Sequence, residues 1–243
     1  MKTLKEIKSD YIDDYSHIPK DDDERYQYLL YLYKVSESDE QTALEQKKQI
    51  EDTIQYDTYK LILYEEPVGK PRPRFKRIKG KNHVYSGNEY YRKLDFKELL
   101  KDDDIEIAKF RDNVISTPCI ITYDAYLKTP HSFNKKEKIL AELKVIRPIV
   151  KPDWDNIGKE YSDLYNKVIW LDDALVISAT VNKYYSLLPR VEITLTFTNA
   201  FYNKYQYRSM KDKVPNGAEI AYFSNGKLIR EEGGRTPCDI TVT

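Results

Sequence analysis

The sequence predicts an α+β fold in which helices pack on a mixed, largely antiparallel sheet and a helical extension precedes the sheet domain. Residues 192–198, Glu-Ile-Thr-Leu-Thr-Phe-Thr, alternate strictly between polar and apolar side chains, which is typical of a half-buried antiparallel strand. Apolar residues in 157–168 recur at i, i+4, i+7, i+8 and i+11. This spacing places them on one face of a helix of about three turns.

Turn residues and changes in the spacing of apolar residues divide the chain into three parts. Residues 1–55 form an acidic extension, with predicted helices starting at Asp21–Glu24 and at about Ser38, where Gln41 completes a capping box. Residues 56–200 form the main domain, in which the other predicted elements are strands at 59–64, 119–127, 176–185 and 190–197 and helices at 88–101 and 134–143. Residues 201–243 form a tail, in which Asn225-Gly226 predicts a hairpin.

The charges are balanced over the whole chain but unevenly placed along it. The 243 residues carry 40 basic and 40 acidic side chains. Residues 1–55 hold 14 acidic and 8 basic side chains, a net charge of −6, so the remainder carries +6. Residues 67–88 contain seven basic side chains and no acidic one. Such asymmetry indicates a polyanionic partner, although a solvated basic loop is equally compatible with it.

Several classes of protein are excluded by composition. Cys119 and Cys238 lie far apart and in no Cys-x-x-Cys pattern, so neither a disulfide-stapled fold nor a structural zinc site is expected. The longest uncharged apolar run, 174–181, is far shorter than the roughly 18 residues of a membrane span. No signal peptide, phosphate-binding loop or Ser-His-Asp arrangement is present. We therefore expect a cytoplasmic protein without a membrane partner.

Acidic residues flank the predicted helix that follows Trp154. Asp153 and Asp155 are two positions apart in an extended segment, so both carboxylates can face one cation. Asp172 and Asp173 follow the helix, and adjacent strand residues face opposite ways, so only one of them can join the same site. Three converging carboxylates suit Mg²⁺, or Mn²⁺ as an alternative, because these ions prefer oxygen ligands.

Lys159 lies four residues after Asp155 and four before Asp163, so the three side chains share one edge of the helix. Its ammonium group could stabilise charge on a phosphate or hold the carboxylates in place. Two simpler interpretations remain open. Asp155 could serve only as a helix N-cap, and Lys159 and Asp163 could form an ordinary surface ion pair.

The pattern around these residues resembles the RusA family of Holliday junction resolvases, endonucleases common in prophages and bacteria. The similar segments cover about 59–198, most of the main domain, and comprise Gly69–Phe75, Lys151–Lys159, Asp163-Leu164, Val168–Val176 and Lys183. One departure is the run Asp163-Leu-Tyr-Asn-Lys167, which lacks the Asn-Gly that often follows the central helix in this family.

The resemblance implies a RusA-like domain that dimerises, binds four-way DNA junctions and cuts symmetrically related strands with Mg²⁺ in recombination and repair. By position, Asp153, Asp155 and Asp173 would be the metal-binding carboxylates, with Asp172 as an alternative to Asp173. Lys159 would be the essential lysine. The residues expected to contact DNA are Lys70, Arg72, Arg74, Lys76 and Arg77.

Two other functions remain open. The first is a less selective metal-dependent nuclease that acts on flaps or forks. The second is a catalytically silent protein that binds branched DNA and recruits a partner protein through residues 1–55. The extension and the tail have no counterpart in the resemblance, so either could extend a dimer interface or bind that partner.

Overall fold

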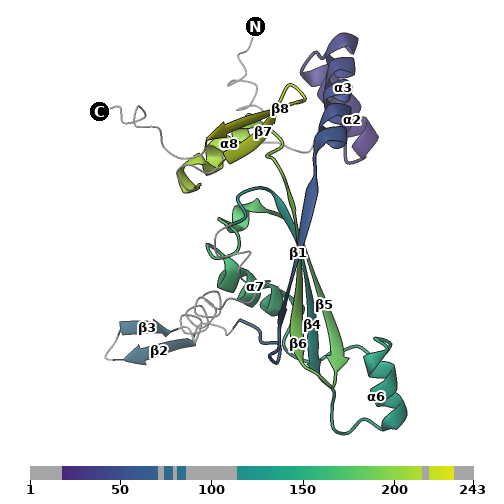
Figure 1. The fold of residues 1–243 in the computed structure, drawn as a ribbon, viewed down its shortest axis with the longest axis vertical. Helices are drawn as coiled ribbons and strands as arrows, with labels where there is room; N and C mark the ends of the chain where they lie inside the picture. The colour runs from purple at the N-terminus through teal and green to yellow at the C-terminus, as the bar shows by residue number, and fades with distance from the viewer. Residues whose placement is uncertain (1–17, 71–73, 79–80, 86–113, 215–218, 233–243) are drawn as a thin grey trace. The chain divides into compact units, whose positions relative to one another are not determined.

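The structure is a computed structural model of the chain, and it describes residues 18–70, 74–78, 81–85, 114–214 and 219–232 (Figure 1). The predicted helix at 88–101 and Arg72 lie outside these ranges. Two compact units are present, one comprising 1–52 with 225–227 and the other 53–224 with 228–243. The described part of the chain contains no helix of the length and apolarity that a bilayer crossing requires.

The first unit contains the two helices expected in the extension, α2 (Asp22–Leu32) and α3 (Glu37–Thr53). Asp21 caps α2, since its carboxylate accepts hydrogen bonds from the backbone N–H groups of Asp23 and Glu24, each at 3.0 Å. The expected capping box of Ser38 and Gln41 is wrong, and α3 begins at Glu37. Its cap is Ser36, whose hydroxyl accepts a bond from the Asp39 N–H at 3.1 Å and donates one to the Asp39 carboxylate at 2.7 Å.

The second unit is built on a four-stranded sheet, which confirms the predicted α+β class with a mixed, largely antiparallel sheet. The strand order is β1-β6-β4-β5, and only the β4–β5 pair is parallel (Figure 1). The order leaves β1 and β5 as the two edges among the described strands. The strands are β1 (Tyr56–Leu63), β4 (Cys119–Lys128), β5 (Val176–Ser186) and β6 (Arg190–Thr198).

Two hairpins lie outside this sheet. One pairs β2 (Arg74–Ile78) with β3 (Lys81–Tyr85). The other pairs β7 (Glu219–Ser224) with β8 (Lys227–Glu232), as the Asn-Gly signal predicts. Asn225 and Gly226 have φ angles of 49° and 75°. Positive φ at both central positions is what a tight two-residue hairpin turn requires.

The helix α7 (Trp154–Tyr165) packs against the sheet through the face that the spacing predicts. Ile157 and Tyr161 are fully buried on it, and Leu164 is 6% exposed. On β4, the Tyr123 hydroxyl lies 3.0 Å from the Ser162 hydroxyl, so a polar contact accompanies the apolar one. This packing fixes the direction of α7 across the strands.

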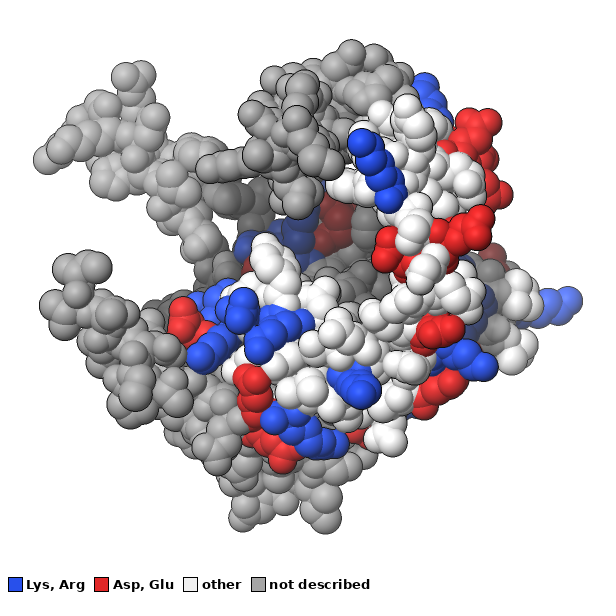
Figure 2. All heavy atoms as spheres, turned by 90° about the horizontal axis from the view of Figure 1, so that it is seen from above, with Lys and Arg blue, Asp and Glu red and all other residues white. Residues whose placement is uncertain are grey.

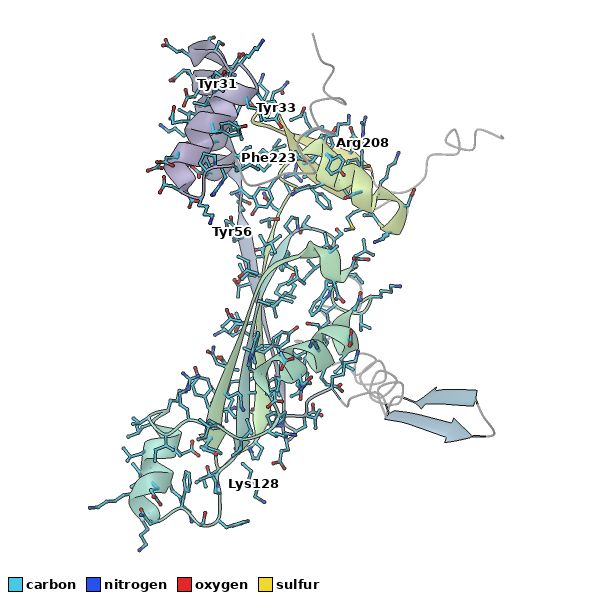
Figure 3. All side chains as sticks on the ribbon, turned by 180° about the vertical axis from the view of Figure 1, so that it is seen from behind. Tyr31, Tyr33, Tyr56, Lys128, Arg208 and Phe223 are labelled. Atoms are coloured by element: carbon cyan, nitrogen blue, oxygen red, sulfur yellow. The ribbon has the colours of Figure 1, made fainter. Side chains whose placement is uncertain are left out.

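Four shorter helical segments lie in the described part of the second unit. The short helix α6 (Lys135–Glu142) begins with the Asn134–Glu137 capping box. Two more follow, η1 (Asp173–Leu175) after α7 and α8 (Lys204–Met210) after the sheet, and α8 continues into η2 (Lys211–Lys213). Within the tail, Tyr207 stacks on Tyr222 with ring centroids 5.2 Å apart, and Phe223 is 2% exposed (Figure 3). The tail therefore contributes buried aromatic residues to the hydrophobic core.

We expect Ile157→Ala to lower the free energy of unfolding by about 2–5 kcal/mol, because it removes buried methyl groups and leaves a cavity between α7 and the sheet. Urea unfolding followed by circular dichroism measures the change. The matched control is Ile139→Ala on α6, where the side chain is 60% exposed and the loss should stay below about 0.5 kcal/mol. Equal losses for the two variants would contradict the packing described for α7.

Candidate metal and DNA site around α7

At the start of α7, two carboxylates stand beside each other without serving as helix caps. Asp153 occupies the N-cap position with extended backbone, yet its side chain makes no capping hydrogen bond. Asp155 lies in the first turn and accepts a hydrogen bond from the Lys159 ammonium at 3.0 Å. This bond lowers the pKa of Asp155. The interpretation of Asp155 as an N-cap is therefore wrong, and both side chains are exposed enough to bind a ligand.

The ion pairs along α7 differ from the expected one. Lys159 pairs with Asp155 and not with Asp163. Asp163 instead pairs with the ammonium of Lys70, which comes from the segment after β1. Lys70 was expected to contact DNA, whereas here its charge is directed onto a carboxylate of α7 and links the start of the basic segment to this helix.

The approach of the basic segment to α7 depends on Gly69. The Lys70 N–H donates to the Asn156 carbonyl at 2.9 Å. A Cβ atom on Gly69 would lie 2.8 Å from the Cβ of Pro152 and 3.1 Å from the Cβ of Asn156. Those distances are shorter than ordinary van der Waals contact, so a glycine is required where this backbone meets the helix start.

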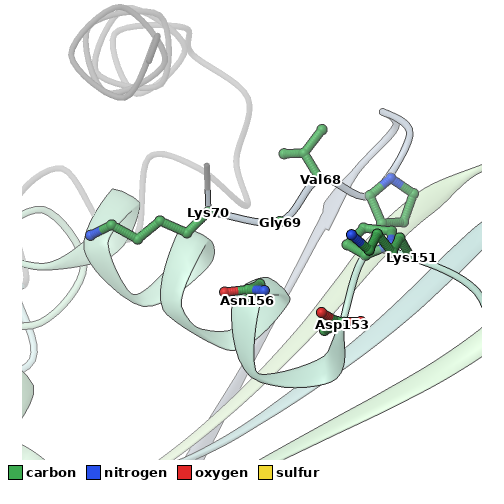
Figure 4. Close-up of a pocket in the computed structure, with 8 residues that line it drawn as sticks. Val68, Gly69, Lys70, Lys151, Asp153 and Asn156 are labelled. Carbon is green, nitrogen blue, oxygen red and sulfur yellow. The ribbon is translucent and has the colours of Figure 1, made fainter. Parts of the chain in front are cut away.

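A pocket of about 480 Å³ opens at this junction (Figure 4). Its lining includes Asp153, Asn156 and Lys151, a carboxylate, an amide and a basic residue, whereas the ammonium of Lys70 is directed to Asp163. The pocket identifies Lys151 and Asn156 as candidate site residues that the sequence motif alone did not single out. Its lining consists of Pro67, Val68, Gly69, Lys70, Lys151, Pro152, Asp153 and Asn156.

The second acidic pair lies beyond the other end of α7. The Asp173 carboxylate accepts hydrogen bonds from the Trp170 indole at 2.8 Å and from the Asn166 amide at 3.0 Å. The Asp172 carboxylate accepts one from the Ala174 N–H at 3.0 Å and pairs with Lys213 at 2.6 Å, which lowers its pKa. Asp172 therefore has a structural role, and exposed Asp173, held by neutral donors, is the better candidate ligand.

The two ends of α7 are too far apart for one ion. Asn166 follows Asp155 by eleven positions, and a rise of 1.5 Å per residue separates them by about 16 Å along the helix. Among the residues that the structure describes, no group of three acidic, histidine or cysteine side chains could hold a metal. This corrects the expectation that Asp153, Asp155 and Asp173 fold into a single pocket.

The rest of the predicted DNA-contacting residues fall on the β2–β3 hairpin or outside the described ranges. Arg74, Lys76 and Arg77 lie on β2, where the register pairs them with residues of β3. Elsewhere, basic and acidic side chains of the described residues lie next to one another on the face shown in Figure 2. Residues 67–88, which include these strands, hold seven basic side chains and no acidic one.

Two comparisons with known proteins indicate the family of this domain. A family model described as endodeoxyribonuclease RusA matches residues 65–196. The uncharacterized protein YqaN of Bacillus subtilis (strain 168) is 33% identical over 147 residues, which cover 59% of this chain and 99% of YqaN. The matched residues include α7 and the two acidic pairs at its ends. The chain belongs to the RusA family of endodeoxyribonucleases, as its motifs indicated.

We expect Lys213→Ala to destabilise the protein at neutral pH by up to about 1 kcal/mol, the usual value for a partly exposed ion pair. Pairing with Lys213 lowers the pKa of Asp172 in the folded protein from its ordinary 3.8. The ion pair therefore stabilises the folded protein above pH 3.8, and this stabilisation is lost as the pH falls through the pKa of the folded state. Urea unfolding at pH 7 and at successively lower pH should show the difference between the variant and the wild type shrinking towards zero. In an Asp172→Asn background, Lys213→Ala should have no effect at any of these pH values; a persistent effect would refute the pairing.

Proposed function

We propose that the protein is a structure-selective endodeoxyribonuclease that resolves Holliday junctions by Mg²⁺-dependent hydrolysis of phosphodiester bonds during DNA recombination and repair. The observation that carries this proposal is the RusA endodeoxyribonuclease match over 65–196, which includes α7, both acidic pairs and the basic segment. The substrate is branched DNA, ideally a four-way junction. A DNA substrate implies a cytoplasmic enzyme.

Asp153 and Asp155 are the proposed metal ligands at the start of α7, and Asp173 is the candidate carboxylate ligand beyond its other end. Carboxylate oxygens fit Mg²⁺, and also Mn²⁺, because both ions prefer hard oxygen donors. When bound, the ion lowers the pKa of a coordinated water and stabilises charge on the phosphate. Asp155 is oriented by Lys159, and Asp173 is oriented by Trp170 and Asn166, so two of the three ligands are held in place.

Lys159 is the proposed source of positive charge at the scissile phosphate. It lies in the second turn of α7, with its side chain 61% exposed, so a DNA strand can reach its ammonium. Before DNA binds, that charge is shared with Asp155. A group placed in advance near developing negative charge stabilises the transition state without further reorganisation.

Phosphate contacts are proposed for Lys70, Arg72, Arg74, Lys76 and Arg77. The Gly69–Asn156 contact supports this assignment, because it anchors the start of the basic segment next to Asp153. Backbone contacts position a duplex without reading its sequence, and they make binding strongly salt-dependent. Two symmetry-related cuts require two sites, so we propose that the active form is a homodimer.

Asp155→Asn should abolish cleavage while leaving the affinity for a four-way junction within a few-fold, because the change removes a ligand charge but keeps the shape of the side chain. Cleavage is measured with Mg²⁺ on a four-way junction, a flap and a linear duplex, and binding is measured without Mg²⁺. Asp124→Asn is the matched control, since Asp124 lies on β4 outside the site and bonds Asn182. It should cut at the wild-type rate.

The three substrates also separate the candidate activities. Paired nicks confined to the junction support a resolvase. Cutting of all three substrates would make the protein a less selective nuclease, and junction binding without cutting would make it a DNA-structure-binding protein. Wild-type cutting by Asp155→Asn would remove that residue from the metal site.

Arg72→Ala should weaken junction binding and lower the slope of log affinity against log salt by about one unit, the expected loss for one phosphate contact. Fluorescence anisotropy with a labelled junction at several salt concentrations gives both numbers. Lys135→Ala, a charge removal at the start of α6, should leave the slope unchanged. If Arg72→Ala also left it unchanged, Arg72 would not belong to the DNA-binding surface.

A further inference from the structure

The helix α8 of the tail presents a polar face to solvent, opposite the face that it buries. Tyr207 and Met210 are 2% and 8% exposed, and they mark the buried side of the helix. The exposed positions recur at i, i+1, i+4 and i+5, which gathers them on the other side. These four positions, called the α8 face below, are Lys204, Tyr205, Arg208 and Ser209 (Figure 3 labels Arg208).

Much of the positive charge on the α8 face is not compensated. Residues 199–214 contain four basic side chains and one acidic side chain. In the described part of the chain, the Arg208 guanidinium forms neither a hydrogen bond nor an ion pair. The Lys204 ammonium lies 3.9 Å from the Glu231 carboxylate, which is long for an ion pair, and the lysine side chain is 46% exposed. Both cations can therefore contact an anion that approaches from solvent.

The start of α8 is held in place by hydrogen bonds and by ring stacking. Asn203 is the N-cap, and its side chain accepts a bond from the Gln206 N–H at 2.9 Å. The Gln206 side chain in turn accepts a bond from the Tyr202 N–H at 3.0 Å. On the buried side, the Tyr207 ring stacks on Tyr222 of β7. The α8 face therefore has a defined arrangement before any ligand binds.

The end of α8 connects this face to one of the acidic pairs. Lys213 follows the helix and pairs with Asp172, the neighbour of the candidate ligand Asp173. Arg208 precedes Lys213 by five positions, which corresponds to roughly 8–10 Å for helical rises of about 1.5–2 Å per residue. One duplex can therefore pass Asp173 and contact the α8 face.

We propose that the α8 face binds the phosphate backbone of a duplex DNA arm next to the Asp173 end of α7. Arginine, lysine, tyrosine and serine side chains are all common donors to phosphate oxygens, and the uncompensated charge favours a polyanion. The proposal rests on the nuclease function proposed above and adds a second DNA-binding surface to it. This surface lies outside the matched residues 65–196, so it is an addition to the family domain.

The salt dependence of binding tests the two cations. Arg208→Ala should lower the slope of log affinity against log salt by about one unit, and Lys204→Ala/Arg208→Ala by about two, because each cation contacts one phosphate. Arg208→Lys keeps the charge and should keep the slope. The measurement is fluorescence anisotropy with a labelled four-way junction, without Mg²⁺. Circular dichroism should show the same fold in all variants.

The matched control is Arg230→Ala. Arg230 is an arginine of the same tail, but it lies on β8 and pairs with Glu219 on β7. Its removal changes the charge of the protein by the same amount as Arg208→Ala, and it should leave the slope unchanged. Equal slopes for the Arg208→Ala variant and the wild type would overturn the proposal, and so would equal losses for Arg208→Ala and Arg230→Ala, since the effect would then depend only on net charge.

Photocrosslinking identifies what contacts the α8 face. The photoreactive residue p-benzoyl-phenylalanine replaces Tyr205, which is 80% exposed, and irradiation with a labelled junction should attach the protein to DNA. Tyr31 on α2 is also 80% exposed and is the control position, because the extension that contains it is acidic. Equal DNA crosslinking at both positions would overturn the proposal. Crosslinks from position 205 to protein alone, such as the acidic residues 1–55, would also overturn it.

Failure of this surface can be distinguished from failure of the nuclease function. A protein that cuts junctions, but whose Arg208→Ala variant keeps the wild-type slope, would lack the α8 surface while remaining a nuclease. Crosslinking of DNA at position 205 by a protein that cuts no junction would refute the proposed function and retain the surface.

Discussion

The contact between the apolar face of α7 and the sheet is the interaction on which the rest of the structure depends. Ile157 and Tyr161 are fully buried there, so the helix has one orientation and one direction across the strands. Because a helix is rigid and rises by a fixed distance per residue, this packing also sets the positions of every charged group along α7. The two acidic pairs are placed by the core rather than by their own interactions.

Lysines from three parts of the chain then distribute positive charge over the acids around α7. Lys159 comes from the helix itself, Lys70 from the segment after β1, and Lys213 from the tail. Each pairs with a different carboxylate, so the net negative charge of the acidic side chains around α7 is reduced before any ligand binds. Asp173 differs from its neighbour in being held by neutral donors. Its charge is therefore oriented but not cancelled, which is the condition that a metal ligand requires.

The elements were largely predictable because they depend on local patterns. The 3.6-residue spacing identified the buried face of α7, Asn225-Gly226 identified the β7–β8 turn, and the predicted helix at 134–143 corresponds to α6. The contacts that shape the site join distant positions. Lys70 and Asp163 are 93 residues apart, and no local pattern pairs them. The failure of the carboxylates to converge was in principle predictable, since a twelve-residue helix separates its own ends.

The two tryptophans of the chain have opposite environments, and each lies beside a different acidic pair. Trp154 lies between Asp153 and Asp155 and is 66% exposed, whereas Trp170 is fully buried and donates its indole N–H to Asp173. Fluorescence from the first should respond to dissolved quenchers, and fluorescence from the second should be shielded from them. The unlabelled protein thus contains a separate optical reporter for each end of α7.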